Sequence, residues 1–198
     1  MTHKAEADNP SLTTMQHNTN EQFKGVLADC RALFAKKLHD YGAAWRVMRP
    51  TSVTDQIFIK AMRIQTLETT GQSMVGDGIQ PEFVAIVNYA IVAMIQCALG
   101  VSYDAAKSMT VDDALKAYDR HAEASLQLMI RKNHDYGEAW RNMRISSFTD
   151  IILQKLLRTK QIEDLNGQTL VSEGVEANYQ DMMNYAMFAL IKFKYGAN

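Results

Sequence analysis

Two short stretches of the chain combine residue types that are suited to binding a ligand. Residues 39–49 read HDYGAAWRVMR, and residues 134–144 read HDYGEAWRNMR. Together they contain both tryptophans of the protein, Trp45 and Trp140. An indole can stack on a nucleobase, and the neighbouring arginines offer paired donors that suit phosphate oxygens. The two stretches therefore predict a binding loop that is written twice.

Basic residues follow each stretch at a helical spacing. Lys60 and Arg63 lie three residues apart. Lys155 and Arg158 repeat this spacing, so each pair projects from one side of a helix. The surrounding windows each carry a net charge of +3, although the whole chain has a net charge of −1. We therefore predict a nucleotide or nucleoside triphosphate as the ligand. The predicted substrate-binding residues are His39, Asp40, Tyr41, Trp45, Arg46, Arg49, Lys60, Arg63, His134, Asp135, Tyr136, Trp140, Arg141, Arg144, Lys155 and Arg158.

A stripe that carries polar residues follows each basic pair in an otherwise apolar stretch. It takes positions i, i+3 and i+6 of a helix and comprises Glu82, Ala85 and Asn88, then Asn178, Asp181 and Asn184. A carboxylate with an amide can bind Mg²⁺ or a water molecule. We therefore take Glu82 and Asp181 as catalytic candidates and Mg²⁺ as the expected cofactor. The predicted metal ligands are Glu82, Glu176, Asp181 and Asn184.

Each of these groups also has a purely structural interpretation. The two tryptophans can be core anchors, the lysines can be solvated, and the arginines can pair with nearby acids. Those acids are Asp40, Asp55, Asp135 and Asp150. Glu173 and Glu176 can stabilise the positive end of a helix, and Asn88 and Asn184 can bond to backbone inside a bundle. The two histidines can carry a proton or simply end a helix.

The loops, basic pairs and stripes recur because the chain is a tandem duplication. Residues 37–68 align with residues 132–163 at an offset of 95, and about half of the aligned positions are identical. A one-residue insertion then brings the tripeptide NYA at 88–90 into register with NYA at 184–186. We refer to the two halves as copy one and copy two.

The apolar periodicity predicts three helices in each copy and few strands. The first helices are expected to start at Thr19 and Thr110, whose side chains can cap backbone amides. They are expected to end at Gly42 and Gly137, because glycine readily adopts the left-handed conformation.

The remaining helices are placed by similar signals. The second helices are expected to begin after Ser52 and Ser147. The third helices are expected to run from Pro81 to Gly100 and from about residue 177 to residue 195. A short helix over 102–109 is expected between the copies.

These elements predict an all-α protein in which two three-helix units pack as one pseudo-twofold helical bundle. The expected segments are a flexible leader (1–18), the first three-helix repeat (19–100), a connector (101–110) and the second three-helix repeat (111–198).

Composition limits the classes of partner. The net charge of −1 and near-neutral pI disfavour nucleic acid and anionic membranes. The apolar stretch 83–99 contains Asn88 and Gln96 and is short for a membrane span, so a buried helix is expected. Cys30 and Cys97 are expected to be buried reduced thiols. With no signal-peptide pattern at the N-terminus, we expect a cytoplasmic protein, and we expect it to form a homodimer.

The recurring motifs KxHDYGxAWRxMR, SxTDxIxxKxxR and NYA resemble the nucleotide modification associated domain 1 family, in two copies over about 21–98 and 116–195. The resemblance implies an all-helical fold and a link to nucleotide or modified-base metabolism. The helix order is also similar to that of MazG-type nucleoside triphosphate pyrophosphohydrolases, which bind Mg²⁺ through paired acidic residues. Here Lys60 and Arg63 stand where carboxylates are expected in that family, which implies a degenerate metal site or one composite site.

Two hypotheses follow. The first is a nucleotide-handling protein that binds its ligand at the Trp-Arg loops, extended to Mg²⁺-dependent pyrophosphohydrolysis. The second is a non-catalytic helical scaffold or protein-interaction module, in which both indoles are buried and both arginines are held by internal groups.

Overall fold

The structure is a computed structural model that describes residues 10–74, 76–168 and 174–196, with side chains from residue 19 onward. In that part of the chain every regular element is a helix, as the sequence predicts. The elements are α1 (Pro10–Tyr41), η1 (Ala44–Val47), α2 (Pro50–Thr70), α3 (Gln80–Leu99), α4 (Tyr103–Ser108), α5 (Val111–Tyr136), η2 (Ala139–Asn142), α6 (Ile145–Asp164) and α7 (Val175–Tyr195).

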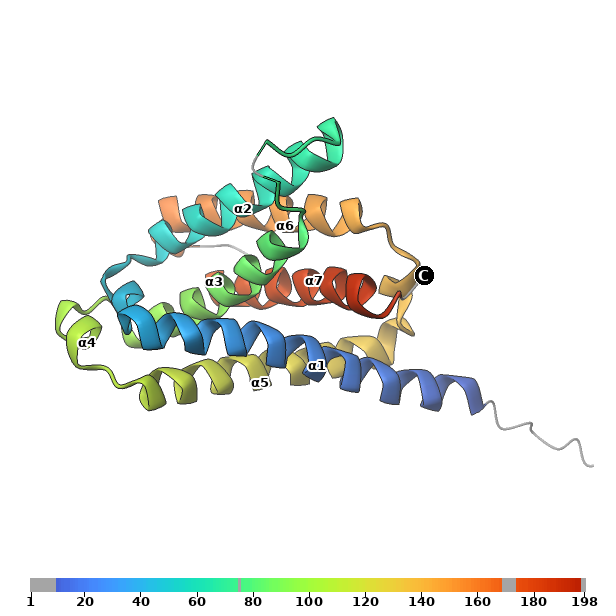
Figure 1. The fold of residues 1–198 in the computed structure, drawn as a ribbon, viewed down its shortest axis with the longest axis horizontal. Coiled ribbons are helices and arrows are strands. Elements are labelled where there is room, and N and C mark those ends of the chain that lie inside the picture. Colours follow the sequence, from blue (N-terminus) through green and yellow to red (C-terminus); the bar gives the residue numbers. More distant parts are fainter. Residues whose placement is uncertain (1–9, 75, 169–173, 197–198) are drawn as a thin grey trace, which may run out of the picture.

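The duplication is visible in the order and packing of these elements. Copy one (α1, η1, α2, α3) is repeated as copy two (α5, η2, α6, α7), with α4 as the connector. Three layers result: α2 with α6, α3 with α7, and α1 with α5 (Figure 1). Because α1 packs on α7 and α5 packs on α3, the halves exchange contacts reciprocally. The predicted pseudo-twofold bundle is confirmed.

The central layer is the core of the molecule. From Ile91 to Gln96 every residue of α3 is buried, and so is every residue of α7 from Ala186 to Ile191. A helix that is apolar all round must be covered on all sides, and the outer layers supply that cover. Helix α3 is long and apolar enough to cross a membrane, but 61% of its most apolar window is buried inside the bundle, as predicted for a core helix.

Equivalent polar pairs tie the outer layer of α2 and α6 together across the pseudo-twofold. The hydroxyl of Thr54 donates to Glu163 at 2.7 Å, and that of Thr149 donates to Glu68 at 3.0 Å. Each pair joins one copy to the other, and the two pairs are related by the repeat. Burial raises the pKa of Glu68, while the Thr149 hydroxyl bond partly offsets the shift.

The repeated asparagines bond to backbone, as the structural interpretation predicts. Asn88 Nδ2 donates to the carbonyl oxygen of Cys30 at 3.1 Å, and Asn184 Nδ2 donates to that of Ser125 at 3.3 Å. The Tyr118 hydroxyl also donates to Asn88 Oδ1 at 2.9 Å. Phe23 occupies the position equivalent to Tyr118, so Asn184 Oδ1 is buried without a hydrogen-bond partner among the described residues.

Most helix ends agree with the sequence. Gly42 and Gly137 follow α1 and α5 with φ of 63° and 58°. Thr110 caps α5, because its hydroxyl oxygen accepts a hydrogen bond from the backbone N–H of Asp113 at 3.1 Å. The third helices and the short helix α4 also lie within about two residues of their predicted ends.

Other predicted ends are wrong. Helix α1 begins at Pro10, so Thr19 lies inside it and donates to Glu138 at 2.6 Å instead of capping. Helices α2 and α6 begin two residues before Ser52 and Ser147, without a side-chain cap. In α2 the first-turn proline, with its fixed φ, already suits the start. Residues 1–9 of the predicted leader lie outside the described residues.

The predicted burial of the two cysteines is correct for one of them and wrong for the other. Both cysteines are free; Cys30 is buried, but Cys97 is exposed near the end of α3. The helix turns this position outward just after the last buried residue, Gln96.

Asn88 and Asn184 differ in whether their side-chain oxygen has a hydrogen-bond donor, and this difference gives a stability prediction. Tyr118→Phe should lower the free energy of unfolding by about 1–3 kcal/mol, because it leaves Asn88 Oδ1 without its donor. Phe23→Tyr should raise it by about 1 kcal/mol, because it offers a donor to Asn184 Oδ1. Urea denaturation of both variants measures the two effects, and a change of the same sign in both would contradict the account.

Candidate functional site

The repeated loops line two equivalent pockets. The first pocket, in copy one, has a volume of about 590 Å³ and lies between α1, η1 and α3. The second pocket, in copy two, has about 240 Å³ and lies between α5, η2 and α7. The first pocket is lined by Leu33, Phe34, Lys37, Leu38, Tyr41, Gly42, Ala44, Trp45, Met48, Lys60, Pro81, Glu82, Ala85, Asn88, Tyr89 and Val92. The second is lined by Met129, Lys132, Asn133, Tyr136, Ala139, Trp140, Met143, Asp181, Asn184, Tyr185 and Phe188.

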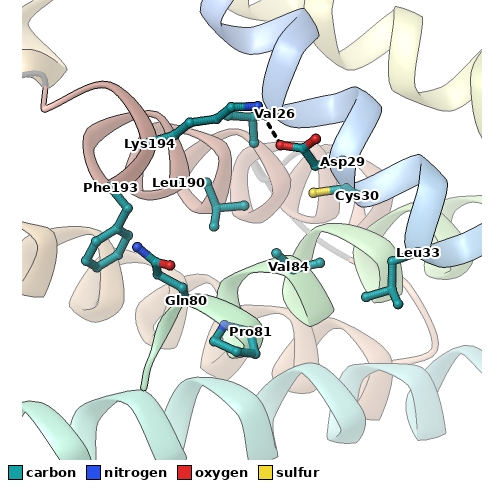
Figure 2. Close-up of a pocket in the computed structure, with 10 residues that line it drawn as sticks. All are labelled: Val26, Asp29, Cys30, Leu33, Gln80, Pro81, Val84, Leu190, Phe193 and Lys194. Atoms are coloured by element: carbon teal, nitrogen blue, oxygen red, sulfur yellow. Dashed lines mark hydrogen bonds and ion pairs between the residues drawn. The ribbon is translucent and has the colours of Figure 1, made fainter. Parts of the chain in front are cut away.

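A third cavity of about 600 Å³ lies elsewhere, between α1, the start of α3 and the end of α7 (Figure 2). Its walls are mainly apolar, and the lysine at its rim, Lys194, is paired with Asp29 at 2.6 Å. None of the predicted site residues lines this cavity. We therefore place the candidate site in the first pocket and its counterpart.

The two indoles are in different environments. Trp45 is partly exposed in the wall of the first pocket, with the Phe34 ring tilted at 43° and 6.3 Å away. Trp140 is only 5% exposed, and Phe188 stacks on it at 4.5 Å and 6° between ring planes. The indole of copy one thus keeps exposed surface in its pocket, whereas that of copy two is packed.

The lysines also differ between the pockets. In copy two Lys132, which lines the second pocket, and Lys155 both bind the Asp181 carboxylate, at 2.6 Å each. In the first pocket Lys60 lies 3.2 Å from Glu82, and Lys37 has no carboxylate within ion-pair distance among the described residues. Cationic donors therefore face the first pocket.

Arg46 and Arg141, predicted as ligand residues, instead point into the bundle. Arg46 is 3% exposed and donates to Gln96, and burial lowers the pKa of its guanidinium. Arg141 binds Glu138, Gln22 and Thr19. The short 3-10 turn places each arginine on the bundle side of its loop, and neither arginine lines a pocket.

The same helices that line the pockets hold the loops. Gln96 Nε2 donates to the Arg46 carbonyl at 3.2 Å, and Lys192 Nζ donates to the Arg141 carbonyl. Gln96 and Lys192 are equivalent in the repeat. A polar residue near the end of each core helix therefore fixes the loop that carries the tryptophan.

Several other predicted ligand residues lie on the outer surface. His39 and His134 are 89% and 82% exposed in their side chains and contact the aspartate that follows each. Helix ends hold them away from both pockets, as the helix-end alternative predicts. The exposed predicted residues that line neither pocket are His39, Asp40, Arg49, His134, Asp135, Arg144 and Arg158.

The predicted Mg²⁺ ligands are not brought together. Glu82 lies in the first pocket and is neutralised by Lys60 and Arg63, whereas Asp181 and Asn184 lie in the second. Glu176 instead approaches His121 at 3.8 Å. No group of three His, Cys, Asp or Glu residues suited to a metal occurs in the described part of the chain. These residues do not fit a resident Mg²⁺, and Glu173 lies outside the described residues.

The structure adds residues that the sequence analysis did not select. Lys37 and Tyr89 line the first pocket beside Tyr41, Trp45 and Lys60. Both lie in repeated sequence motifs, since Lys37 is the first residue of KxHDYGxAWRxMR and Tyr89 is the tyrosine of NYA. Their repetition in both copies is the sequence signal that marks them.

The repeated segments match one family. The profile of the family described as nucleotide modification associated domain 1 matches residues 37–97 and 132–193, which together are more than half of the chain. The chain belongs to this family. Each match runs from the pocket lysine, Lys37 or Lys132, through the tryptophan loop to the core helix. No curated protein and no solved structure matches the chain, so the likeness to MazG-type enzymes stays a prediction.

The two loop arginines of this family member give a matched pair of predictions. Arg141→Met should lower the free energy of unfolding by about 3–5 kcal/mol, because it leaves the buried Glu138 carboxylate without its cation. Arg46→Met should cost much less, because Ala43 occupies the position equivalent to Glu138 and no carboxylate is stranded. Urea denaturation compares them, and an equal loss would contradict this assignment.

Asp181 gives a pH prediction. Burial alone would raise the pKa of Asp181, but the bonds and charges of Lys132 and Lys155 outweigh burial and lower it. Its contribution to stability is therefore complete above the ordinary aspartate pKa of 3.8 and is lost as the pH falls through the lowered value. Asp181→Asn should cost about 1–2 kcal/mol at pH 7 and much less at pH 2.

Urea denaturation at the two pH values measures this difference, with Asp135→Asn at an exposed position as the control. A cost that is the same at both pH values would show that the lysine pairs do not stabilise the fold.

Proposed function

We propose that the first pocket is a nucleotide-binding site. In this proposal the base stacks on Trp45, and the phosphate is bound by Lys37 and Lys60. The observation that carries the proposal is the convergence of an indole, two tyrosines and two lysines on one open pocket.

The size and composition of the pocket support the proposal. A volume of about 590 Å³ lies in the usual range for small-molecule sites, about 300–1,000 Å³. Tyr41, Trp45 and Tyr89 provide aromatic surface, while polar groups at the edge can fix the orientation of a ligand. The second pocket, at about 240 Å³, is below that range.

Local charge favours an anionic ligand. Lys60 and Arg63 share one carboxylate, Glu82, so this cluster keeps a positive charge. Lys37 adds a further cation from α1. A phosphate between these groups would make charge-assisted hydrogen bonds, which are stronger than neutral ones.

The family supports the same ligand class, since its description concerns nucleotide modification. The residues described here account for binding and orientation of a nucleotide. We propose no hydrolytic step, because both candidate carboxylates, Glu82 and Asp181, are held by cations of the chain itself.

Copy two fits the second hypothesis, a scaffold role. Trp140 is buried under Phe188, and the Arg141 guanidinium lies 4.4 Å from the indole centroid. The loop of copy two thus acts as a packing device. We propose that one duplicated motif serves for binding in one copy and for stability in the other.

Calorimetric titration tests the binding proposal. The full chain should bind at least one of the common deoxynucleoside 5′-phosphates, without any requirement for Mg²⁺. Lys37→Met should weaken that binding about tenfold, because a charge-assisted hydrogen bond contributes about 1.5 kcal/mol or more.

Lys36→Met is the matched control, since Lys36 is exposed and lines neither pocket. It should leave the affinity unchanged. An absence of heat and of any thermal shift with every mono-, di- and triphosphate tested would contradict the proposal.

A further inference from the structure

The two pockets differ at one position that decides whether the indole is open. Val92 of α3 lines the first pocket, and the repeat places Phe188 of α7 at the equivalent position. Phe188 lies nearly parallel to Trp140, with 4.5 Å between ring centroids. A planar ring therefore already occupies the stacking position in copy two, and the smaller Val92 leaves that position open in copy one.

A second substitution between the copies concerns charge. Ala85 of the first pocket is equivalent to Asp181 of the second. The Asp181 carboxylate bridges Lys132 and Lys155, at 2.6 Å from each. The equivalents of these lysines are Lys37 and Lys60, which both line the first pocket. An anionic group therefore already lies between the two lysines in copy two, and no side chain of α3 supplies it from the equivalent position in copy one.

We propose that copy two is a self-filled form of the site, in which the Phe188 ring and the Asp181 carboxylate occupy the positions that a ligand's ring and anionic group take in copy one. This inference rests on the proposed function of the first pocket and defines its ligand more closely. It also sets the stoichiometry at one ligand per chain.

The spacing of the two internal groups limits the ligand. Residues 181 and 188 are seven apart on α7, which corresponds to a rise of about 10 Å along a helix. A ring and an anionic group must be joined over a distance up to this length. A nucleoside with a phosphate on its sugar meets that requirement.

The charge of the first pocket selects among nucleotides. Lys37 and Lys60 line the pocket, and Arg63 binds the lining residue Glu82, so three positive charges lie in or beside the pocket and Glu82 offsets one of them. A phosphate monoester carries about −1.5 to −2 at neutral pH, which balances the remainder. In copy two a single carboxylate is enough to bridge two lysines. The ligand class is therefore a nucleoside monophosphate in preference to a triphosphate.

The experiment exchanges the two residues between the copies and measures stoichiometry. The probes are the four deoxynucleoside 5′-monophosphates and 8-anilinonaphthalene-1-sulfonate, an aromatic anion that is not a nucleotide. The wild-type chain should bind one equivalent of a probe. Asp181→Ala combined with Phe188→Val opens copy two and should raise the number to two.

The reciprocal variant combines Ala85→Asp with Val92→Phe and fills copy one. It should bind no probe, and its melting temperature should be equal to or higher than that of the wild-type chain, because it adds a ring on Trp45 and an anion between two lysines. Loss of binding without loss of stability distinguishes a filled pocket from a damaged fold. This variant keeps the test decisive even if the opened variant of copy two does not fold.

The outcomes separate this inference from the proposed function. If nucleoside monophosphates bind the wild-type chain, but the filled variant still binds one equivalent, the inference is overturned and nucleotide binding survives. A second outcome is that no nucleotide binds, but the sulfonate probe binds with zero, one and two equivalents to the filled, wild-type and opened chains. In that case the proposed function fails, and the inference that copy two is a self-filled form of the site stands. Tighter binding of triphosphates than of monophosphates by the wild-type chain would overturn the ligand class.

Discussion

The packing of α3 against α7 organises the whole bundle. Both helices are apolar over most of their surface, so neither copy can cover its own third helix with only two others. Each is covered by its partner and by helices of both copies. The duplication therefore produces one bundle and not two separate domains. It also places one pocket in each copy, between a first helix, a tryptophan loop and a core helix.

Duplication lets the two sides diverge within one fold. Hydroxyl donors appear in copy two as Tyr118 and Tyr179, where copy one has Phe23 and Phe83. The buried carboxylate Glu138 likewise has Ala43 as its counterpart, and it holds Arg141. These changes make the interior of copy two richer in polar bonds. Copy one keeps a partly exposed indole and unfilled space, which are the features that a binding site needs.

Sequence reasoning predicts the fold well because its signals are local. Glycines at helix ends, the Thr110 cap and the apolar periodicity act within a few residues, and the glycine ends recur in both copies. The start of α1 is missed because Thr19, which resembles a cap, instead serves a contact with Glu138 from the other copy. Contacts across the pseudo-twofold depend on the assembled bundle, which no local pattern encodes.

The candidate site is predicted only in part for the same reason. The loop tryptophans, Lys60 and the stripe of α3 do line the pockets, because helical spacing fixes which side chains share a face. The direction of Arg46 depends on a 3-10 turn and on Gln96, 50 residues away in the chain. The difference between the indoles depends on Val92 and Phe188, whose effects appear only when the core helix lies beside the loop.

One indole of the protein keeps exposed surface in a pocket, and the other is covered by the protein itself. Acrylamide quenching of two single-tryptophan chains tests it most directly, with Trp140→Phe leaving Trp45 and Trp45→Phe leaving Trp140. Trp45 should emit at longer wavelength and should be quenched several-fold more strongly than Trp140. Equal quenching of the two indoles, or stronger quenching of Trp140, would contradict it.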